Sequence, residues 1–454
     1  MSRWLIVLGP VLSLALCVVL ISHDWTAEAA ITASVTFLCA LWWIFEPVPI
    51  PFTSLIPLAL FPLFGVLTPA QVGQSFGSPL ILLLMGGFIL STAMAESGAH
   101  RRIALYMVNL FGGDSARGLV LGFMAAAAVL SMWISNTATT LMLLPVALAV
   151  LERSQKNLAV PLLLGIAYAA SIGGLGTPIG TPPNLIFMQV HLDEFGHTPS
   201  FPEWMSWGIP VVVLFVPLVG LWLTRGIKLK APVDLPQVGA WRPPEKRVMI
   251  MFGLTAFFWI TRQAPFGGWS GLLGLPQAND ASVALIACVI MAALPNGEGG
   301  RLLRWKAANR IPWGVLLLFA GGITIAHAFM QSGLAEIIAD QLVAIVDLPA
   351  WLLILSMCLA VTFLTEVTSN TATASLLMPL LAATSIATGI EPMLLMVPAA
   401  LSASCAFMLP VATAPNAIVF GSGKIRVKDM AKAGFVLNLA GAVIITLVSL
   451  LILD

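Results

Sequence analysis

The chain has 454 residues, of which 59% are hydrophobic and only 9% are charged. A water-soluble protein of this size could not cover its core with so few charges, so the composition indicates a membrane protein. The 21 Lys and Arg nearly balance the 20 Asp and Glu, which argues against a nucleic-acid partner, since such a partner favours a basic surface.

Thirteen apolar stretches follow along the chain, and a helix needs about 20 apolar residues to cross the hydrocarbon core. The first resembles a secretory signal, but it is longer than a usual signal core, so we expect residues 1–28 to form a retained first span and its loop. The stretches lie at 4–22, 29–45, 50–67, 79–97, 119–150, 158–190, 207–224, 248–264, 281–294, 313–330, 350–389, 392–421 and 433–453.

Two of these stretches, 119–150 and 350–389, are too long for one crossing. A polar cluster interrupts each one, Ser135-Asn136-Thr137 in the first and Ser369-Asn370-Thr371 in the second. The halves flanking the first cluster reach only part-way across a bilayer. We therefore predict two re-entrant hairpins whose polar tips lie deep in the membrane.

The distribution of basic residues supports these hairpins. With a cytoplasmic amino terminus, two hairpins and eleven crossing stretches, 20 of the 21 Lys and Arg lie inside and only Arg262 lies outside. If either hairpin crossed instead, every later loop would change sides and this bias would be lost. We expect a multi-pass protein of the cell inner membrane with its carboxyl terminus outside.

The sequence also repeats itself. The Gly86-Gly87 pair, the Ser135-Asn136-Thr137 cluster and the segment ending at Asn184 recur 235, 234 and 232 residues later. The first hairpin opens from inside and the second from outside, so the repeats are inverted, as in many secondary transporters. The predicted fold is all-α and polytopic, with about 11 transmembrane helices and two hairpins. Repeat 1 spans 29–224, a cytoplasmic linker spans 225–247 and repeat 2 spans 248–454.

Each repeat also contains a predicted broken helix. Glycines and prolines crowd the segment from Gly173 to Asn184 within 158–190, and Pro410 and Pro415 interrupt 392–421. Proline removes a hydrogen-bond donor and glycine permits unusual dihedral angles, so the helix should unwind there. A simple packing kink is the alternative, because both residues are frequent in membrane helices.

The polar tips suit a charged solute. Irregular backbone at membrane depth is tolerated where it lines a cavity or is packed in protein. A helix that restarts after each tip directs its positive end at the cluster, which suits a carboxylate, and freed carbonyls suit a sodium ion. The alternative is that the hydroxyl groups only bond back to their own helices.

These paired motifs resemble those of the divalent-anion:sodium symporter family over nearly the whole chain. The resemblance implies a sodium-coupled transporter of dicarboxylates, citrate or sulfate that acts as a homodimer, with a domain holding both hairpins that slides past a scaffold. The substrate residues that it implies are Asn136, Thr137, Thr181, Ser369, Asn370, Thr371 and Thr413. It places one sodium near Ser131, Ser135, Asn136 and Gly180, and a second near Thr365, Thr368, Asn370 and Ala412.

Ser131 and Thr365 each precede their cluster by four residues, and this symmetry favours sodium coupling over plain exchange. With the resemblance, the predicted function is the import of C4-dicarboxylates such as succinate, fumarate or malate coupled to sodium. One departure is Ala414, where many relatives have proline. The alternatives are a sodium-independent dicarboxylate or citrate exchanger, a sulfate symporter and, from another class, an anion channel. An enzyme would need a nucleophile with a base or a metal motif, and the sequence has none.

Three further features concern single residues. Glu366 lies within the second hairpin, where it either takes a proton or tunes the cation site, or bonds to groups of its own hairpin. His327 lies within a span, and we expect a packing role rather than a proton relay. The cysteines lack the spacing of a disulfide framework or a metal site, and we expect packing roles for Cys17, Cys39, Cys288, Cys358 and Cys405.

Overall fold

The computed structural model describes residues 2–112, 115–152, 158–225, 239–263, 267–334 and 349–453, together with residues 227 and 337. Every regular element in these ranges is a helix, which confirms the predicted all-α class. Most of the linker predicted at 225–247 lies outside the described residues. The five cysteines are unpaired, and all except Cys17 are buried.

The elements of the first half follow the predicted stretches closely. They are α1 (Ser2–Ser22), α2 (Ala27–Phe45), α3 (Ile50–Thr53), α4 (Leu55–Leu63), α5 (Pro69–Phe76), α6 (Pro79–Ser97), α7 (Ala99–Gly112), α8 (Ala116–Ser131), α9 (Asn136–Glu152), α10 (Ala159–Gly173), the 3-10 helix η2 (Gly174–Gly176), α11 (Pro182–Phe195) and α12 (Phe201–Leu223).

The second half contains the remaining helices in a similar order. They are α13 (Pro243–Ile260), α14 (Gly268–Leu272), α15 (Asp280–Ala293), α16 (Trp305–Ala308), α17 (Trp313–Gln331), α19 (Ala350–Leu364), α20 (Asn370–Thr388), α21 (Pro392–Ala403), α22 (Ala414–Phe420) and α23 (Val427–Ile452).

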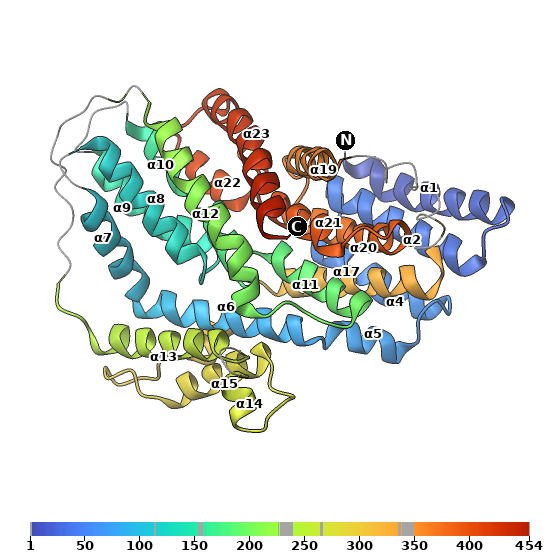
Figure 1. Cartoon of the computed structure of the whole chain (residues 1–454), viewed down its shortest axis with the longest axis horizontal. Helices are drawn as coiled ribbons and strands as arrows, with labels where there is room; N and C mark the ends of the chain where they lie inside the picture. The colour runs from blue at the N-terminus through green and yellow to red at the C-terminus, as the bar shows by residue number, and fades with distance from the viewer. Residues whose placement is uncertain are drawn as a thin grey trace.

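The hairpins and broken helices occupy the middle of the molecule. The arms α8 and α9 pack against each other and on α10, the arms α19 and α20 both pack on α21, and α11 and α22 pack among these helices (Figure 1). Helices α13 and α15 pack on α6 along one side, and α1 packs on α2 at the far end of the molecule (Figure 1). Elements more than 200 residues apart in the sequence, such as α9 and α22, are thus direct neighbours.

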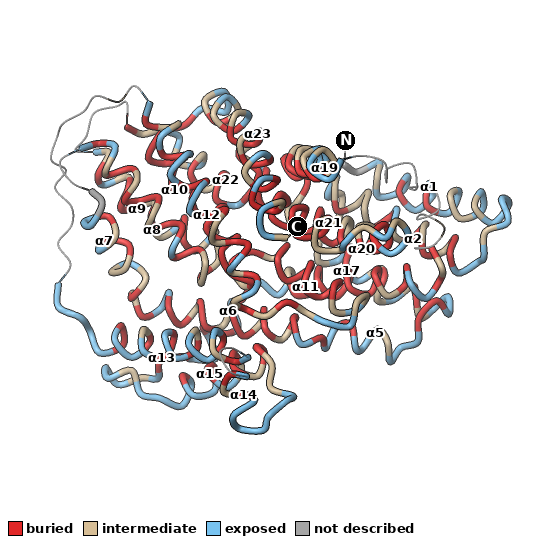
Figure 2. Tube along the Cα trace, in the orientation of Figure 1, coloured by how far each residue is buried: buried red, intermediate tan, exposed pale blue. Residues whose placement is uncertain are grey.

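Burial follows this arrangement. The segment Ala159–Gly176 is 89% buried in its most apolar window, whereas only 11% of the window in Trp4–Ser22 is buried. Figure 2 shows the same contrast between the central helices and α1. Because the exposed face of α1 is apolar, with Trp4 76% exposed, it suits contact with lipid chains rather than with water.

Eight helices in the described residues are long and apolar enough to cross a membrane, by length and composition. Seven of them match predicted crossings, and the eighth, Asn370–Thr388, is an arm of the second hairpin. Four of the eleven predicted crossings are absent from this set: the 50–67 stretch is divided at Ser54, α13 carries three charged residues, α15 has only 14 residues, and the 392–421 stretch is interrupted after α21. The number of crossings and the inversion of the repeats stay predictions. Helices α5 and α7 were not predicted, because they lie between or beyond the apolar stretches.

Candidate functional site

Both hairpins break at their Ser-Asn-Thr clusters. Helix α8 ends at Ser131 and α9 begins at Asn136, while α19 ends at Leu364 and α20 begins at Asn370. At the first tip, the Ser135 hydroxyl accepts a hydrogen bond from the backbone N–H of Ala138 at 3.2 Å. This bond satisfies one of the free N–H groups in the first turn of α9, and the other free N–H groups of that turn remain directed at the tip.

The broken helices restart in the same way as each other. Thr181 precedes α11 with φ −146° and ψ 144°, and Thr413 precedes α22 with φ −140° and ψ 152°. Both helices have proline in their first turn, where its missing N–H and fixed φ are tolerated. The proline positions in the sequence therefore determine where each helix begins again.

An asparagine fixes each unwound turn from behind. The Asn184 amide donates to the carbonyls of Gly174 at 3.0 Å and Thr177 at 2.8 Å. In the other half, the Asn416 amide donates to the carbonyl of Ala406 at 3.1 Å and to that of Leu409 at 3.0 Å. The acceptors lie ten and seven residues before the asparagine in both cases, so the two motifs make matching bonds.

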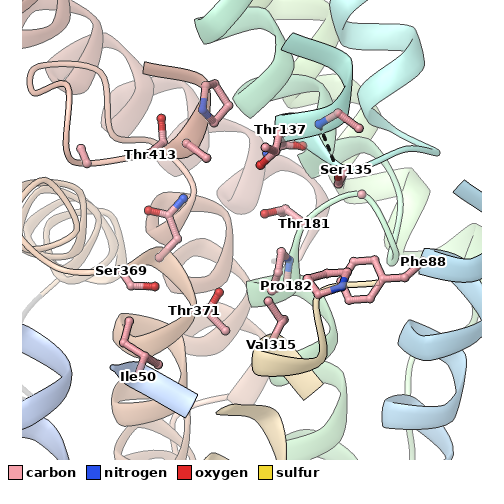
Figure 3. Close-up of a pocket in the computed structure, with 18 of the residues that line it drawn as sticks. Ile50, Phe88, Ser135, Thr137, Thr181, Pro182, Val315, Ser369, Thr371 and Thr413 are labelled. Carbon is pink, nitrogen blue, oxygen red and sulfur yellow. Dashed lines mark hydrogen bonds between the residues drawn. The ribbon is translucent and has the colours of Figure 1, made fainter. Parts of the chain in front are cut away.

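The two tips and the two turns enclose a single cavity of about 870 Å³. In Figure 3, the labelled hydroxyl side chains from both halves surround this space. Every residue of the implied substrate set lines it: Asn136, Thr137, Thr181, Ser369, Asn370, Thr371 and Thr413. Of the implied sodium residues, Ser131 and Thr365 lie behind the lining, fully buried.

Oxygen atoms converge behind the first tip. The Ser131 hydroxyl lies 2.5 Å from Asn136 Oδ1. The same edge of the Asn136 amide lies 3.2 Å from the carbonyl oxygens of Gly180 and of Ala170. An amide oxygen here has the Ser131 hydroxyl as a donor but faces two carbonyl oxygens, whereas an amide nitrogen turned to the same edge can donate to both carbonyls.

A related arrangement lies behind the second tip. The Thr365 hydroxyl lies 2.7 Å from Asn370 Oδ1 and 2.9 Å from the carbonyl oxygen of Ala403. The Thr368 hydroxyl lies 2.5 Å from that of Thr373. Thus Ser131 and Thr365, four residues before their clusters, contact the asparagine of the tip in both hairpins.

Glu366 does not bond to its own hairpin. Its carboxylate accepts the backbone N–H groups of Phe407 at 2.6 Å, Met408 at 2.8 Å and Leu409 at 3.1 Å, and the Asn438 amide at 2.8 Å. The alternative in which Glu366 bonds to groups of its own hairpin named the wrong partners. The Glu366 carboxylate is buried against the turn after α21 and bonds to that turn instead. The carboxylate joins the hairpin, that turn and α23.

Two charged residues of the cavity lining, Glu46 and Arg310, were not predicted. They are the charged residues among the described lining residues, and both are exposed. Glu46 follows α2 with φ 45°, a conformation that non-glycine residues rarely adopt. No motif in the sequence marks these residues, because only the packing of α2 and α17 against the hairpins brings them to the cavity.

Comparison with known proteins identifies the family. A family model described as a citrate transporter matches residues 40–397. The sodium-dependent dicarboxylate transporter SdcS of Staphylococcus aureus (strain bovine RF122 / ET3-1) is 38% identical over 469 residues, which cover 98% of this chain and 89% of that protein. The chain belongs to the divalent-anion:sodium symporter family. Members of this family are transporters, which confirms the expected non-enzymatic class and a multi-pass membrane protein.

Solved structures of other transporters share the fold of this symporter. The YdaH transporter of Alcanivorax borkumensis matches with a TM-score of 0.59 at 16% identity, over 86% of this chain and 87% of that chain. MtrF of Neisseria gonorrhoeae, described with a class of antimetabolite efflux pumps, matches with a TM-score of 0.59 at 15% identity, over 86% and 84%. At these identities the likeness concerns the fold alone.

The first turn depends on Gly180. A Cβ atom at this position would lie 2.9 Å from the Gly174 Cα and closer still to the Gly174 carbonyl oxygen, which are backbone atoms that cannot move aside. We expect Gly180→Ala to displace the turn and to abolish transport, measured as substrate uptake into proteoliposomes. Gly253→Ala is the control, because nothing lies within 4 Å of its added Cβ. Wild-type uptake by Gly180→Ala would contradict a tightly closed turn.

Proposed function

We propose that this chain is a secondary active transporter that imports C4-dicarboxylates together with sodium ions. The observation that carries the proposal is the convergence of both hairpin tips and both unwound turns on one cavity. The 38% identical relative is named a sodium-dependent dicarboxylate transporter, and the similarity extends over 98% of this chain. The two together favour a dicarboxylate over citrate or sulfate.

The charge of the cavity explains why a cation is needed. The tips and turns contribute hydroxyl, amide and backbone groups, and the charged lining residues Glu46 and Arg310 offset each other. A dianion in such a place is costly unless positive charge accompanies it. A sodium ion about 4 Å from a carboxylate contributes roughly 4 kcal/mol of attraction at the effective dielectric of a protein surface.

The oxygen clusters behind the tips are the proposed sodium sites. The first comprises Ser131, Ser135, Asn136 and Gly180, and the second comprises Thr365, Thr368, Asn370 and Ala412. In the sodium-bound form, the Asn136 amide presents its oxygen to the ion, and without sodium it presents its nitrogen to the nearby carbonyls. Because each asparagine belongs to both a sodium site and the substrate site, cation binding orders the groups that contact the substrate.

The substrate carboxylates lie at the positive ends of α9 and α20. Asn136 and Thr137 contact one carboxylate and Asn370 and Thr371 the other, with Thr181, Ser369 and Thr413 at the sides. A dicarboxylate thus bridges the two halves, whereas a monocarboxylate would occupy only one end.

Transport proceeds by an elevator-type movement in which the hairpins, the broken helices, α12 and α23 move as one body. Bonds across the halves support such a body, since Thr181 Oγ1 lies 3.2 Å from Ser404 Oγ and the Tyr168 hydroxyl donates to the Phe407 carbonyl at 2.7 Å. Glu46 and Arg310 lie at the ends of α2 and α17 that the charge pattern assigns to the cytoplasm. The cavity therefore opens inward in this conformation. The homodimer implied by the family resemblance stays a prediction.

The coupling is tested by succinate uptake into proteoliposomes with an inward gradient of sodium, potassium or choline. We expect uptake only with sodium, because the tips and turns have no charged side chain to replace it and Arg310 is offset by Glu46. Equal uptake in all three salts would contradict sodium coupling, and uptake that needs internal dicarboxylate would favour the exchanger. Citrate and sulfate as competitors report the substrate class, and steady single-channel currents would favour the channel.

Asn136→Ala and Asn370→Ala should each reduce succinate uptake at least about a hundredfold, because each removes a ligand shared by a sodium ion and the substrate. The melting temperature in detergent should stay close to that of the wild type without sodium. Asn109→Ala on the exposed side of α7 is the matched control. Normal uptake by both tip variants would remove the tips from the site.

Arg310 should attract the dianion to the cavity. Arg310→Gln is expected to raise the KM for succinate about two- to fivefold at low ionic strength, an effect that choline chloride should screen at fixed sodium concentration. The exposed Lys306→Gln in α16 is the control for a general loss of positive charge. An equal rise in KM for both variants would show that the position of Arg310 at the cavity is irrelevant.

A further inference from the structure

A chain of polar side chains connects three helices beside the broken helix. Ser75 Oγ on α5 lies 2.8 Å from His327 Nδ1 on α17, and His327 Nε2 lies 3.2 Å from Asp193 Oδ2 on α11. Gln189 Nε2 donates to Asp193 Oδ1 at 2.7 Å, and the Ser75 hydroxyl donates to the carbonyl of Gln71 at 3.1 Å. His327 is therefore not only a packing residue, as the sequence led us to expect.

The hydrogen atoms available decide which form of His327 completes this chain. A neutral imidazole has one N–H, and if that N–H donates to Asp193, Nδ1 must accept the only hydroxyl hydrogen of Ser75. The Gln71 carbonyl then loses its donor. A protonated imidazole donates from both nitrogens, to Ser75 Oγ and to Asp193, and leaves the Ser75 hydrogen for Gln71. With Asp193 ionised, only the protonated imidazole makes every bond in the chain.

We propose that His327 is a proton-binding site that ties α11 to α5 and α17 and holds the symporter in this conformation. The inference rests on the proposed transport function, because α11 follows the turn with Gly180 and Thr181 and moves with it. When a proton binds His327, the contact to Asp193 becomes an ion pair and the moving body is held in place. When the proton leaves, one hydrogen bond is lost and the body is released. Acid therefore slows transport.

Few other charged groups surround His327. Helices α2, α3, α4, α5, α6, α11 and α20 pack against α17. Of these, α3, α4, α5 and α20 contain no charged residue. The acidic residues and histidines within the others are Glu28 of α2, Glu96 of α6, and His191, Asp193 and Glu194 of α11, and α2 also contains the buried Cys39. Glu96 lies 3.3 Å from Arg304 and is thus already paired.

Glu194, the neighbour of Asp193 on α11, is a further acidic group near His327. It lies beyond the apolar stretch 158–190, and burial together with the charge of Asp193 raises its pKa to about 7, against the opposing effect of His327. A pH dependence of transport can therefore arise from Glu194 as well as from His327. The experiment must separate these two groups.

The same three residue types also form hydrolytic triads, but hydrolysis is not supported here. The Ser75 side chain is fully buried and does not line the cavity, so no substrate carbonyl reaches its hydroxyl. A nucleophile must contact the reacting carbon. The arrangement fits a contact between helices rather than a catalytic group.

The test measures initial succinate uptake into proteoliposomes at external pH 6 and pH 8. We expect wild-type uptake to be slower at pH 6 than at pH 8, by roughly two- to fivefold, because acid favours the form in which His327 holds α11 to α5 and α17. His327→Gln and Asp193→Asn should both lose most of this difference, and Glu194→Gln should retain it. His197→Gln is the control, because His197 is an exposed histidine that follows α11 two residues after its end. Substrate protonation is the same for every variant and cancels in the comparison.

A second measurement needs no substrate. The melting temperature of the purified protein in detergent should exceed that of His327→Gln by more at pH 6 than at pH 8, since the ion pair exists only when His327 carries a proton. If neither the wild type nor any variant transports succinate, the proposed function fails. The melting experiment still tests the ion pair between His327 and Asp193. A wild-type pH profile in His327→Gln, or equal melting differences at both pH values, would overturn the inference. If His327→Gln does not fold, Asp193→Asn is compared with the wild type in the same two measurements.

Discussion

The structure depends on how the backbone groups released by four interruptions of helices are satisfied at membrane depth. Lipid offers no hydrogen-bond partner, so each interruption must be packed in protein or must line a cavity. Asn184 and Asn416 meet this requirement for the carbonyls of the two turns, and Glu366 meets it for three N–H groups of the second turn. The remaining polar groups face the cavity, where a charged solute can use them.

The sequence predicted the interruptions well, because their causes are local. Proline and glycine act on the backbone within a few residues, so the sequence located the interruption between Gly173 and Asn184, and α11 begins within that segment at Pro182. Most helix ends were within a few residues of the stretch boundaries, but α12, α13 and α23 begin five or six residues before their stretches, and α11 continues five residues beyond its stretch to Phe195.

Contacts between distant segments could not be predicted in this way. Ser75 and His327 are 252 residues apart, and Arg310 reaches the cavity only because α17 packs against the second hairpin. The partners of Glu366 were wrong for the same reason, since a single sequence shows that a buried carboxylate needs donors but not which segment supplies them. Local sequence motifs located the site, whereas tertiary packing brings the charged residues Glu46 and Arg310 to its lining.

The two halves of the site are alike in outline but are held by different forces. In the second half, a carboxylate holds the turn, and hydrogen bonds to an ionised group are roughly twice as strong as neutral ones. In the first half, neutral groups do this work: the Thr177 hydroxyl donates to the Met132 carbonyl and the Trp204 indole to the Leu175 carbonyl at 2.9 Å. The second turn is therefore the more firmly fixed of the two. The edge of the Asn136 amide that faces the Gly180 and Ala170 carbonyls lies beside the first turn. The oxygen atoms of the first proposed sodium site therefore gather at the turn that has the greater freedom to rearrange.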